Sequence, residues 1–422
     1  RWTVRRRLFS VATLTNAAVF GMTSIVSLLL LDVGYSAYLN SSRSNFDYGK
    51  ARVFDENIWV GELYPKLYYP TERNFAIHKP NVRVAGSPYG NFYSTPMLSS
   101  PTLLGSVLAR QPVDIRINAV GFRESSALGD AEIMALGDSF TFGWGVGESE
   151  SWPKLLEREL DMTVYNLGVH DASPKQELEL LRYLLEQRGD KIRMKKLVWM
   201  IYEGNDLEDD YSEEVARHDK PVSVPLFEGT LIESAEDLMK TIRKQSVITR
   251  LRRGQVSWGK SNKKTSGNPF SVDGVELLYP LYTSEEIGPR LFYQSYVDLA
   301  GMPASYVVTH WNREALEGVF DVMRKLAESH EFEVAVIFSP TAARLHGPYF
   351  TDFPELSGRA HFLELVRHLA VSAGFSFVDL YDLMKPYAST ELLYFRDDDH
   401  FNQRGHALAA DMIARELFRS KE

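Results

Sequence analysis

Two blocks of this sequence, far apart in the chain, hold side chains suited to nucleophilic chemistry. In Leu136–Gly143, Ser139 follows an apolar segment and precedes a glycine-rich turn. In Arg396–His406, His400 follows three consecutive aspartates. A free serine hydroxyl is a weak nucleophile, and it becomes reactive when a histidine that a carboxylate holds in one tautomer removes its proton. The two blocks together predict a nucleophilic serine.

Two further blocks supply groups that can stabilise a negatively charged oxygen. Val164–Gly168 ends in Gly168, a glycine that can bring its backbone N–H close to a reacting oxygen. Tyr202–Asp206 contains Asn205, whose side-chain amide can donate to a developing oxyanion. Each block alone is equally typical of a simple turn or a helix cap. The functional interpretation therefore depends on all four occurring together.

The segments around these blocks alternate between strand and helix patterns, which predicts a parallel sheet with helices on both faces. Three of the four blocks follow a predicted strand, and ligands of open parallel sheets lie at the carboxyl ends of the strands. The predicted strands are Glu132–Leu136, Thr163–Asn166, Leu197–Tyr202, Val334–Phe338 and Phe375–Val378. The predicted helices are Trp152–Leu160, Pro174–Arg188, 308 to about Ser329, His361–Ala373 and Gly405–Phe418.

With all four blocks in this order, the sequence resembles the SGNH (GDSL-like) hydrolase superfamily. The four signature residues of that family match Ser139, Gly168, Asn205 and His400. The resemblance covers about residues 131–210 and 308–422, and it implies a three-layer α/β/α, flavodoxin-like fold. The other main serine hydrolase fold is disfavoured, because its Gly-x-Ser-x-Gly motif requires a glycine where this chain has Thr141.

The resemblance also implies a role for each residue. Ser139 would be the nucleophile and His400 the general base, oriented by Asp397 at the usual offset of three residues. The N–H groups of Ser139 and Gly168 and the amide of Asn205 would form the oxyanion hole. Asp398 is the alternative orienting carboxylate, because the three aspartates are consecutive and some related acyltransferases use the residue two positions before the histidine.

The amino-acid composition argues against several other classes of function. The 422 residues include 47 Lys and Arg against 56 Asp and Glu, a net charge of −9, which argues against nucleic acid as the partner. The absence of cysteine excludes disulfides, thiolate metal sites and a cysteine nucleophile. No metal-binding or dinucleotide-binding motif is present, so we expect neither a metal nor another cofactor.

The N-terminal region predicts a membrane anchor. Leu8–Leu31 comprises 24 residues without a charge, preceded by four arginines and followed by Asp32. As a helix this segment spans roughly 36 Å, enough to cross a bilayer, and the arginines place the N-terminus in the cytoplasm. A cleaved signal peptide would have a shorter apolar region and an Ala-x-Ala site, and a buried core helix is the third option. Because the parts outside the matched blocks look like membrane-anchored bacterial members of the family, we expect a single-pass inner-membrane protein with its catalytic domain in the periplasm.

The chain is thus expected to comprise an anchor region (1–39), an irregular lead-in with a few strands (40–128) and an α/β domain (129–422) interrupted by an insertion at about 211–305. Within the insertion, Lys240–Lys264 contains nine basic residues and no acidic one. The ordinary interpretation of this stretch is a solvated surface. The alternative is contact with anionic lipid headgroups or with a partner protein.

Three functions follow as hypotheses. The first is an esterase that removes acyl groups from an extracytoplasmic glycan or lipid through a serine acyl-enzyme. The second is an O-acyltransferase that acts on a cell-envelope polysaccharide with the same residues. The third is a non-catalytic accessory subunit of a membrane-protein complex, which the anchor, the basic stretch and the large insertion favour.

Overall fold

The structure is a computed structural model, and it describes most of residues 52–86, residues 113–188, 192–208 and 280–419 apart from 357–359, two short strands near residue 274, and Thr23 and Ser27. The chain divides into two compact units, residues 1–48 with 232–266, and residues 49–231 with 267–422. Every element named below belongs to the second unit.

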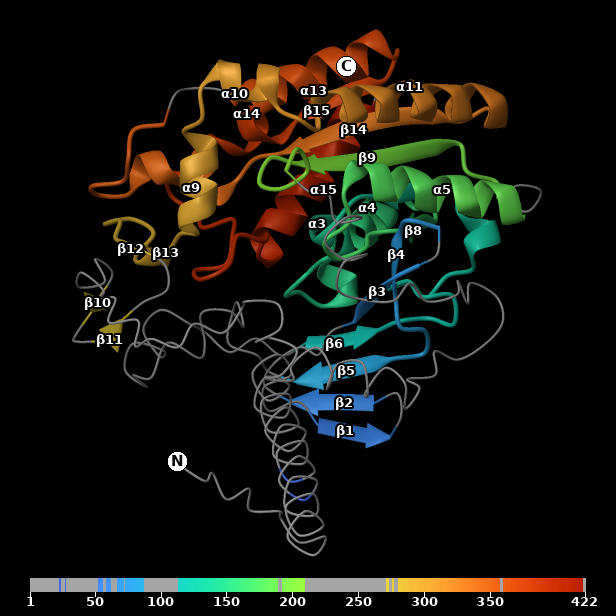
Figure 1. Ribbon diagram of the computed structural model, residues 1–422, viewed down its shortest axis with the longest axis horizontal. Coiled ribbons are helices and arrows are strands. Elements are labelled where there is room, and N and C mark those ends of the chain that lie inside the picture. Colours follow the sequence, from blue (N-terminus) through green and yellow to red (C-terminus); the bar gives the residue numbers. More distant parts are fainter. Residues whose placement is uncertain are drawn as a thin grey trace, which may run out of the picture. The chain divides into compact units, whose positions relative to one another are not determined.

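A five-stranded, wholly parallel sheet forms the centre of this unit (Figure 1). In order across the sheet its strands are β15 (Ser376–Asp379), β14 (Glu333–Ser339), β9 (Lys196–Tyr202), β7 (Ile133–Leu136) and β8 (Val164–Asn166). The longest pairing runs from Glu333 opposite Lys196 to Ser339 opposite Tyr202. Each strand coincides closely with a predicted one, so the predicted parallel α/β fold is confirmed.

Helices cover both faces of this sheet. One face carries α5 (Pro174–Arg188), α11 (Arg313–His330) and α13 (His361–Ser372), and the other carries α4 (Trp152–Leu160), α14 (Leu380–Met384) and α15 (Gln403–Leu417). The shorter helices are η2 (Leu128–Asp130), α3 (Ser139–Phe142), η3 (Glu148–Glu150), α9 (Gln294–Ala300), α10 (Ala304–Thr309), α12 (Ala342–His346) and η4 (Gly347–Tyr349).

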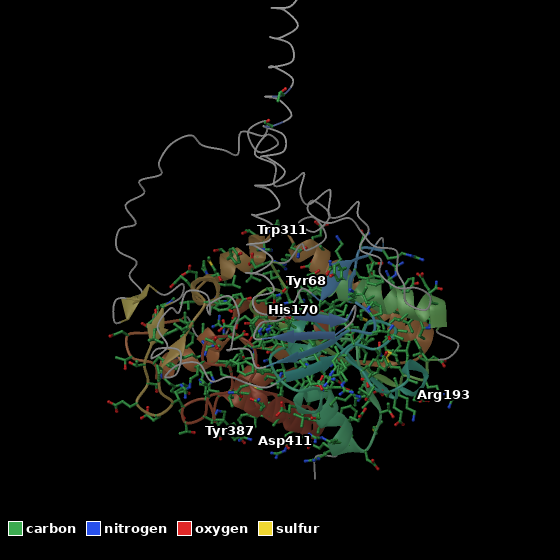
Figure 2. All side chains as sticks on the ribbon, turned by 90° about the horizontal axis from the view of Figure 1, so that it is seen from below. Tyr68, His170, Arg193, Trp311, Tyr387 and Asp411 are labelled. Carbon is green, nitrogen blue, oxygen red and sulfur yellow. The ribbon has the colours of Figure 1, made fainter. Side chains whose placement is uncertain are left out.

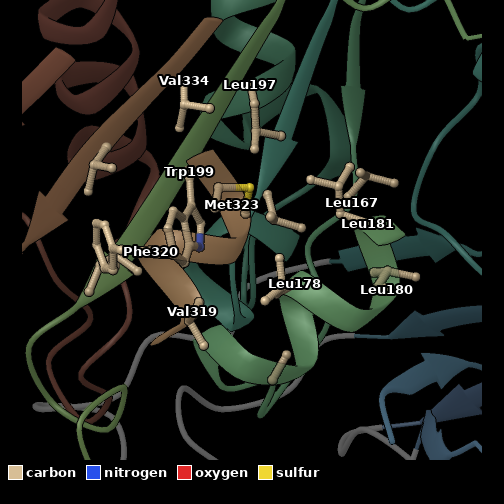
Figure 3. Packing of buried hydrophobic residues seen from close by; sticks show 14 of the residues in the cluster. Leu167, Leu178, Leu180, Leu181, Leu197, Trp199, Val319, Phe320, Met323 and Val334 are labelled. Carbon is tan, nitrogen blue, oxygen red and sulfur yellow. The ribbon is translucent and has the colours of Figure 1, made fainter. Parts of the chain in front are cut away.

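Alternate residues of β9 enter two separate cores, because successive side chains of a strand point to opposite faces. Leu197, Trp199 and Ile201 pack in the core under α5 and α11, whereas the residues between them pack under α4 and α15. Figure 3 shows Trp199 beside Phe320 of α11, with ring centroids 4.9 Å apart. A strand buried on both faces must be apolar throughout, which explains why its sequence is a continuous apolar run.

The predicted lead-in is more ordered than its sequence indicated. It forms a four-stranded mixed sheet of β1 (Arg52–Asp55), β2 (Ile58–Gly61), β5 (Arg83–Gly86) and β6 (Val113–Arg116), and a hairpin of β3 (Tyr68–Pro70) and β4 (Ala76–His78). Leu67 and Ile115 pack with Phe142 and Trp144 in one small core. The lead-in therefore contacts the segment that carries Ser139.

The end of the predicted insertion belongs to the α/β core. It contains the antiparallel pairs β10 (Ser271–Val272) with β11 (Val275–Glu276) and β12 (Leu281–Tyr282) with β13 (Arg290–Leu291), followed by α9. Phe292 and Val297 are buried in the same core as strand residues of β7 and β9. The basic stretch Lys240–Lys264 lies outside the described residues. The predicted domain boundaries remain predictions.

The predicted anchor Leu8–Leu31 also lies outside the described residues, except for Thr23 and Ser27, which are helical. In the described part of the chain, no helix is long and apolar enough to cross a membrane. The anchor therefore remains a prediction from the sequence.

Candidate active site

Ser139 lies at the carboxyl end of β7, where the chain turns into α3. Gly137 makes the turn possible, since its φ is +153° and a Cβ there would lie 2.3 Å from the hydroxyl oxygen of Thr141. Asp138 caps the helix by accepting a hydrogen bond from the N–H of Phe140 at 2.9 Å. Ser139 is therefore held on a rigid turn, at the sheet edge where the sequence predicted it.

His400 lies in the loop before α15 and connects Ser139 with a carboxylate. Its Nε2 is 2.7 Å from the Oγ of Ser139, and its Nδ1 is 2.6 Å from an Oδ1 of Asp398. Because an ionised carboxylate only accepts hydrogen bonds, Nδ1 carries the proton and Nε2 accepts the serine hydroxyl. In this arrangement a histidine can remove the proton of a serine.

The carboxylate at Nδ1 of His400 is Asp398, which the sequence analysis gave as the alternative, and not Asp397, which it preferred. The Oδ1 of Asp398 also accepts the backbone N–H of His400 at 3.0 Å, which closes a tight turn in which the aspartate folds over the residue two positions later. The single Nδ1 proton of His400 is donated to Asp398. Asp397 is buried in the same loop, with 2% of its surface exposed.

The neighbouring carboxylates change the pKa of His400. Burial would lower the pKa of His400, but the carboxylates of Asp398, Asp138 and Asp399 outweigh burial and raise this pKa above its ordinary value of 6.5. Burial would raise the pKa of Asp398, yet its contacts with His400 and the charge of Arg290 hold that pKa below its ordinary range. Asp398 therefore stays ionised, while His400 can accept a proton near neutral pH.

Gly168 does not offer the N–H that the sequence assigned to the oxyanion hole, so this prediction is wrong. Its N–H is donated to the Oδ1 of Asn166 at 2.8 Å, and Asn166 in turn donates to the carbonyl of Thr141 at 2.9 Å. A Cβ at Gly168 would lie 2.1 Å from the backbone nitrogen of Phe142. This glycine therefore allows the loop after β8 to approach α3 closely.

A cavity of about 90 Å³ contains Ser139 and His400 in its wall. A cavity needs a volume of roughly 10–15 Å³ to hold one water molecule. At about 90 Å³, this cavity has room for a short acyl group and part of its leaving group. Asn205 follows β9 as predicted and lines the same cavity. The full described lining is Asp138, Ser139, Phe140, Trp144, His170, Asp171, Tyr202, Asn205, Tyr293, Tyr296, Asp398, Asp399 and His400.

Two lining residues, His170 and Asp171, lie in the loop after β8, beyond the predicted block Val164–Gly168. His170 stacks on Trp144, with ring centroids 4.2 Å apart. Asp171 has a left-handed backbone, with a φ of +57°, which non-glycine residues seldom adopt. The signal in the sequence was a histidine and an aspartate shortly after the predicted strand that ends at Asn166, but the nearby Gly168 was assigned to the site instead.

Other site residues come from the predicted insertion. Tyr293 and Tyr296, in and just before α9, line the cavity, and the rings of Tyr296 and Tyr202 meet edge to face with centroids 5.9 Å apart. No motif marks these tyrosines in the sequence. They reach the cavity because the last part of the predicted insertion packs on the α/β core beside β9.

Arg290 of β13 holds the loop that carries Asp398 and His400. Its guanidinium, which is wholly buried, donates to Asp399 Oδ1 at 2.6 Å and to the backbone carbonyls of Asp398 at 2.8 Å and Phe395 at 3.1 Å. Burial raises the pKa of Asp399, and the opposing charge of Arg290 offsets part of that rise. The last part of the predicted insertion thus fixes the backbone of the loop that carries His400.

Replacing Arg290 with methionine should lower the free energy of unfolding by about 3–5 kcal/mol, because the buried Asp399 loses its partner. Chemical denaturation of both proteins measures this difference. Arg415→Met is the matched control, since Arg415 pairs with Asp411 one helical turn away on the surface, and it should change stability by less than about 1 kcal/mol. Equal effects of the two substitutions would contradict the importance of the buried pair.

No group of three or more His, Asp or Glu side chains in the described ranges is arranged to hold a metal ion. Two histidines outside the cavity are core residues. His346 contacts the carbonyl of Ala388 at 3.1 Å and accepts the N–H of Leu393 at 3.1 Å. His406 accepts the N–H of Trp152 at 3.3 Å.

Neither a protein-family model nor a curated protein matches this chain by sequence. Several solved structures are similar to it. A member of the lipolytic protein G-D-S-L family from Veillonella parvula DSM 2008 is 12% identical over 69% of this chain and 100% of its own, with a TM-score of 0.31. An extracellular lipase from Streptomyces rimosus is 12% identical over 68% of this chain and 100% of its own, with a TM-score of 0.35. The acetyl xylan esterase AlAXEase is 10% identical over 68% of this chain and 99% of its own, with a TM-score of 0.33.

The chain's own side chains provide the features on which its chemistry depends. The parallel sheet, the serine at the end of β7 and the histidine before the last helix are all present.

Proposed function

We propose that this protein is a serine esterase whose nucleophile is Ser139. The observation that carries the proposal is the chain of contacts from Ser139 Oγ to His400 Nε2 at 2.7 Å and from His400 Nδ1 to Asp398 at 2.6 Å, in the wall of a cavity. A serine that serves only packing or capping has no need of a histidine held in one tautomer at this distance.

In the proposed reaction, Ser139 Oγ attacks the ester carbonyl while His400 Nε2 takes the hydroxyl proton. The protonated ring is stabilised by Asp398. The carbonyl oxygen becomes an oxyanion, for which the Asn205 amide and the N–H of Ser139, in the first turn of α3, are the donors. The C–O bond to the leaving alcohol then breaks as His400 returns the proton to it, and water releases the acyl group from Ser139 by the same steps.

Labelling with a fluorophosphonate probe tests this proposal directly, because such probes react with activated serines. We expect one adduct, on Ser139, located by fragmentation mass spectrometry. Ser149 is an internal control, since it is exposed in the short helix η3 and should stay unmodified. Folded protein without an adduct on Ser139, or with equal labelling of both serines, would contradict the proposal and favour the non-catalytic subunit.

An O-acyltransferase is the second candidate, because a sugar hydroxyl can resolve the same acyl-enzyme in place of water. It is favoured by three aromatic side chains in the cavity wall, those of Tyr202, Tyr293 and Tyr296, which would limit the access of water to a bound ester. Measuring how the acyl group partitions between water and a glycan acceptor separates the two activities.

The cellular setting is part of the same proposal. The uncharged segment Leu8–Leu31 and the arginines before it support an inner-membrane anchor with the catalytic domain in the periplasm. The substrate would then be an acylated glycan or lipid of the cell envelope. Accessibility of the domain to protease in intact spheroplasts tests this placement.

A further inference from the structure

Asp171, His170 and Tyr202 lie in the wall of the cavity that contains Ser139. Asp171 lies beside the Ser139–His400 pair in this wall, and its side chain is 42% exposed. The carboxylate is nonetheless fixed in place. The hydroxyl of Tyr68 donates to its Oδ2, and the Nε2 of His170 lies 3.6 Å from its Oδ1.

The lead-in hairpin supplies this support. Tyr68 of β3 packs against the ring of His170 with centroids 5.1 Å apart, and Figure 2 marks both side chains. His78 of β4 accepts the backbone N–H of His170 at 3.5 Å while its own Nδ1 faces the carbonyl of Gly121 at 3.2 Å. A segment some ninety residues earlier in the chain thus holds the loop after β8 in its left-handed turn.

Two buried polar atoms of this wall have no hydrogen-bond partner among the described residues, the hydroxyl of Tyr202 and the Nδ1 of His170. Tyr202 is 2% exposed and His170 is 7% exposed. Buried polar groups are nearly always hydrogen-bonded, so partners for these atoms are expected from a bound molecule. A ligand with several hydroxyl groups both donates and accepts hydrogen bonds, as such a wall requires.

The charge of the wall selects among such ligands. Carboxylates of Asp138, Asp171, Asp398 and Asp399 line the cavity, and its described lining includes no lysine or arginine. An anionic substrate would be repelled there, because like charges a few ångströms apart interact strongly outside bulk water. A neutral hydroxyl, by contrast, can donate a hydrogen bond to the carboxylate of Asp171.

The geometry points to a sugar-binding subsite in which Asp171, positioned by Tyr68, accepts hydrogen bonds from hydroxyls of an uncharged glycan that carries the ester. This inference rests on the proposed esterase function and narrows its substrate from glycan or lipid to a neutral glycan. It also gives the lead-in hairpin a function, since Tyr68 is a positioning residue for substrate recognition.

The test compares three acetyl esters on the full-length protein. These are 4-nitrophenyl acetate, a mono-O-acetyl methyl glucoside, and the corresponding acetyl methyl glucuronide, which adds one negative charge. We expect the wild type to prefer the neutral glycoside over the glucuronide by about tenfold or more in kcat/KM. In Asp171→Asn, which keeps the shape and tolerates the left-handed backbone, this preference should fall at least about fivefold.

Asp171→Gly removes the acceptor without straining the backbone. The ratio of kcat/KM for the neutral glycoside to that for 4-nitrophenyl acetate should fall at least about tenfold in this variant, mainly through KM. Tyr68→Phe should lower the ratio by a smaller factor. Asp161→Gly is the matched control, because Asp161 also has a left-handed backbone, with a φ of +53°, at the end of α4, and it should leave the ratio unchanged.

An unchanged ratio in Asp171→Gly, or equal losses on all three esters, would overturn the subsite. Titrating the acetyl glycoside into Ser139→Ala and into Ser139→Ala/Asp171→Gly tests the subsite without turnover, and binding should weaken about tenfold in the double variant. Binding that is the same in both proteins also overturns the subsite. Failure of the esterase itself is separate, because the wild type would then leave 4-nitrophenyl acetate intact and Ser139 unlabelled.

Discussion

Ester hydrolysis should fall by about 10⁴-fold or more when Ser139 is replaced with alanine, because the attacking oxygen is lost and only the surrounding donors remain. The substitution removes one oxygen from a side chain that is 5% exposed, so the fold should be retained. Initial rates with 4-nitrophenyl acetate, at enzyme concentrations high enough to detect a slow residual rate, measure the effect.

Ser149→Ala is the matched control, since Ser149 is exposed and has no role in the proposed reaction. Its rate should equal that of the wild type. If Ser139→Ala keeps more than about a tenth of the activity, Ser139 is not the nucleophile. If the wild type hydrolyses no ester although it is folded, the accessory-subunit hypothesis gains support, and deletion of Leu8–Leu31 becomes the decisive experiment.

Asp398→Asn should lower kcat by about 10³–10⁴-fold, because an amide at this position can donate to Nδ1 and so favour the wrong tautomer of His400. Asp397→Asn is the control, and it also tests whether Asp397 orients His400. It keeps the shape of a buried side chain that does not receive the Nδ1 proton in the structure, and it should cost far less. A larger loss in Asp397→Asn would restore Asp397 as the orienting residue.

The pH profile should distinguish the same two variants. Activity requires neutral His400, so kcat/KM should rise with pH through the pKa of His400, which the neighbouring carboxylates raise above 6.5. Removing the charge of Asp398 removes the strongest of these influences, so the acidic limb should move to lower pH in Asp398→Asn. In Asp397→Asn the limb should stay where it is in the wild type. A limb that moves to higher pH in Asp398→Asn would contradict the proposed electrostatics.

Much of the α/β fold can be predicted from the sequence, because its elements carry local signals. Pro174–Arg188 is a helix in both the prediction and the structure, since its leucines recur at helical spacing and its proline occupies the first turn, where no N–H is needed. Lys196–Tyr202 is a strand as predicted, because a buried parallel strand is apolar on both sides. The sequence predicts Ser139 and His400 as candidates for the same reason, since each lies in a recognisable block next to such an element, and the structure brings the two side chains into contact.

The sequence predictions are wrong where backbone geometry and contacts between distant segments decide the position of a residue. Gly168 and Asp171 are three residues apart in one loop, and only the fold shows that the first faces α3 while the second lines the cavity. Asp397 and Asp398 are adjacent, and a single tight turn decides which one meets His400.

The sequence by itself therefore determined the order of strands and helices, the serine and the histidine, and the edge of the sheet where they meet, because periodicity and strand-end motifs are local properties of the chain. Only the tertiary structure decided which carboxylate orients His400 and which residues complete the cavity wall. Tyr68, Arg290 and Tyr296 reach the site from segments without a motif, through packing contacts and hydrogen bonds that join parts of the chain roughly a hundred or more residues apart. Such contacts depend on how whole layers pack together, and no pattern within a single segment encodes them.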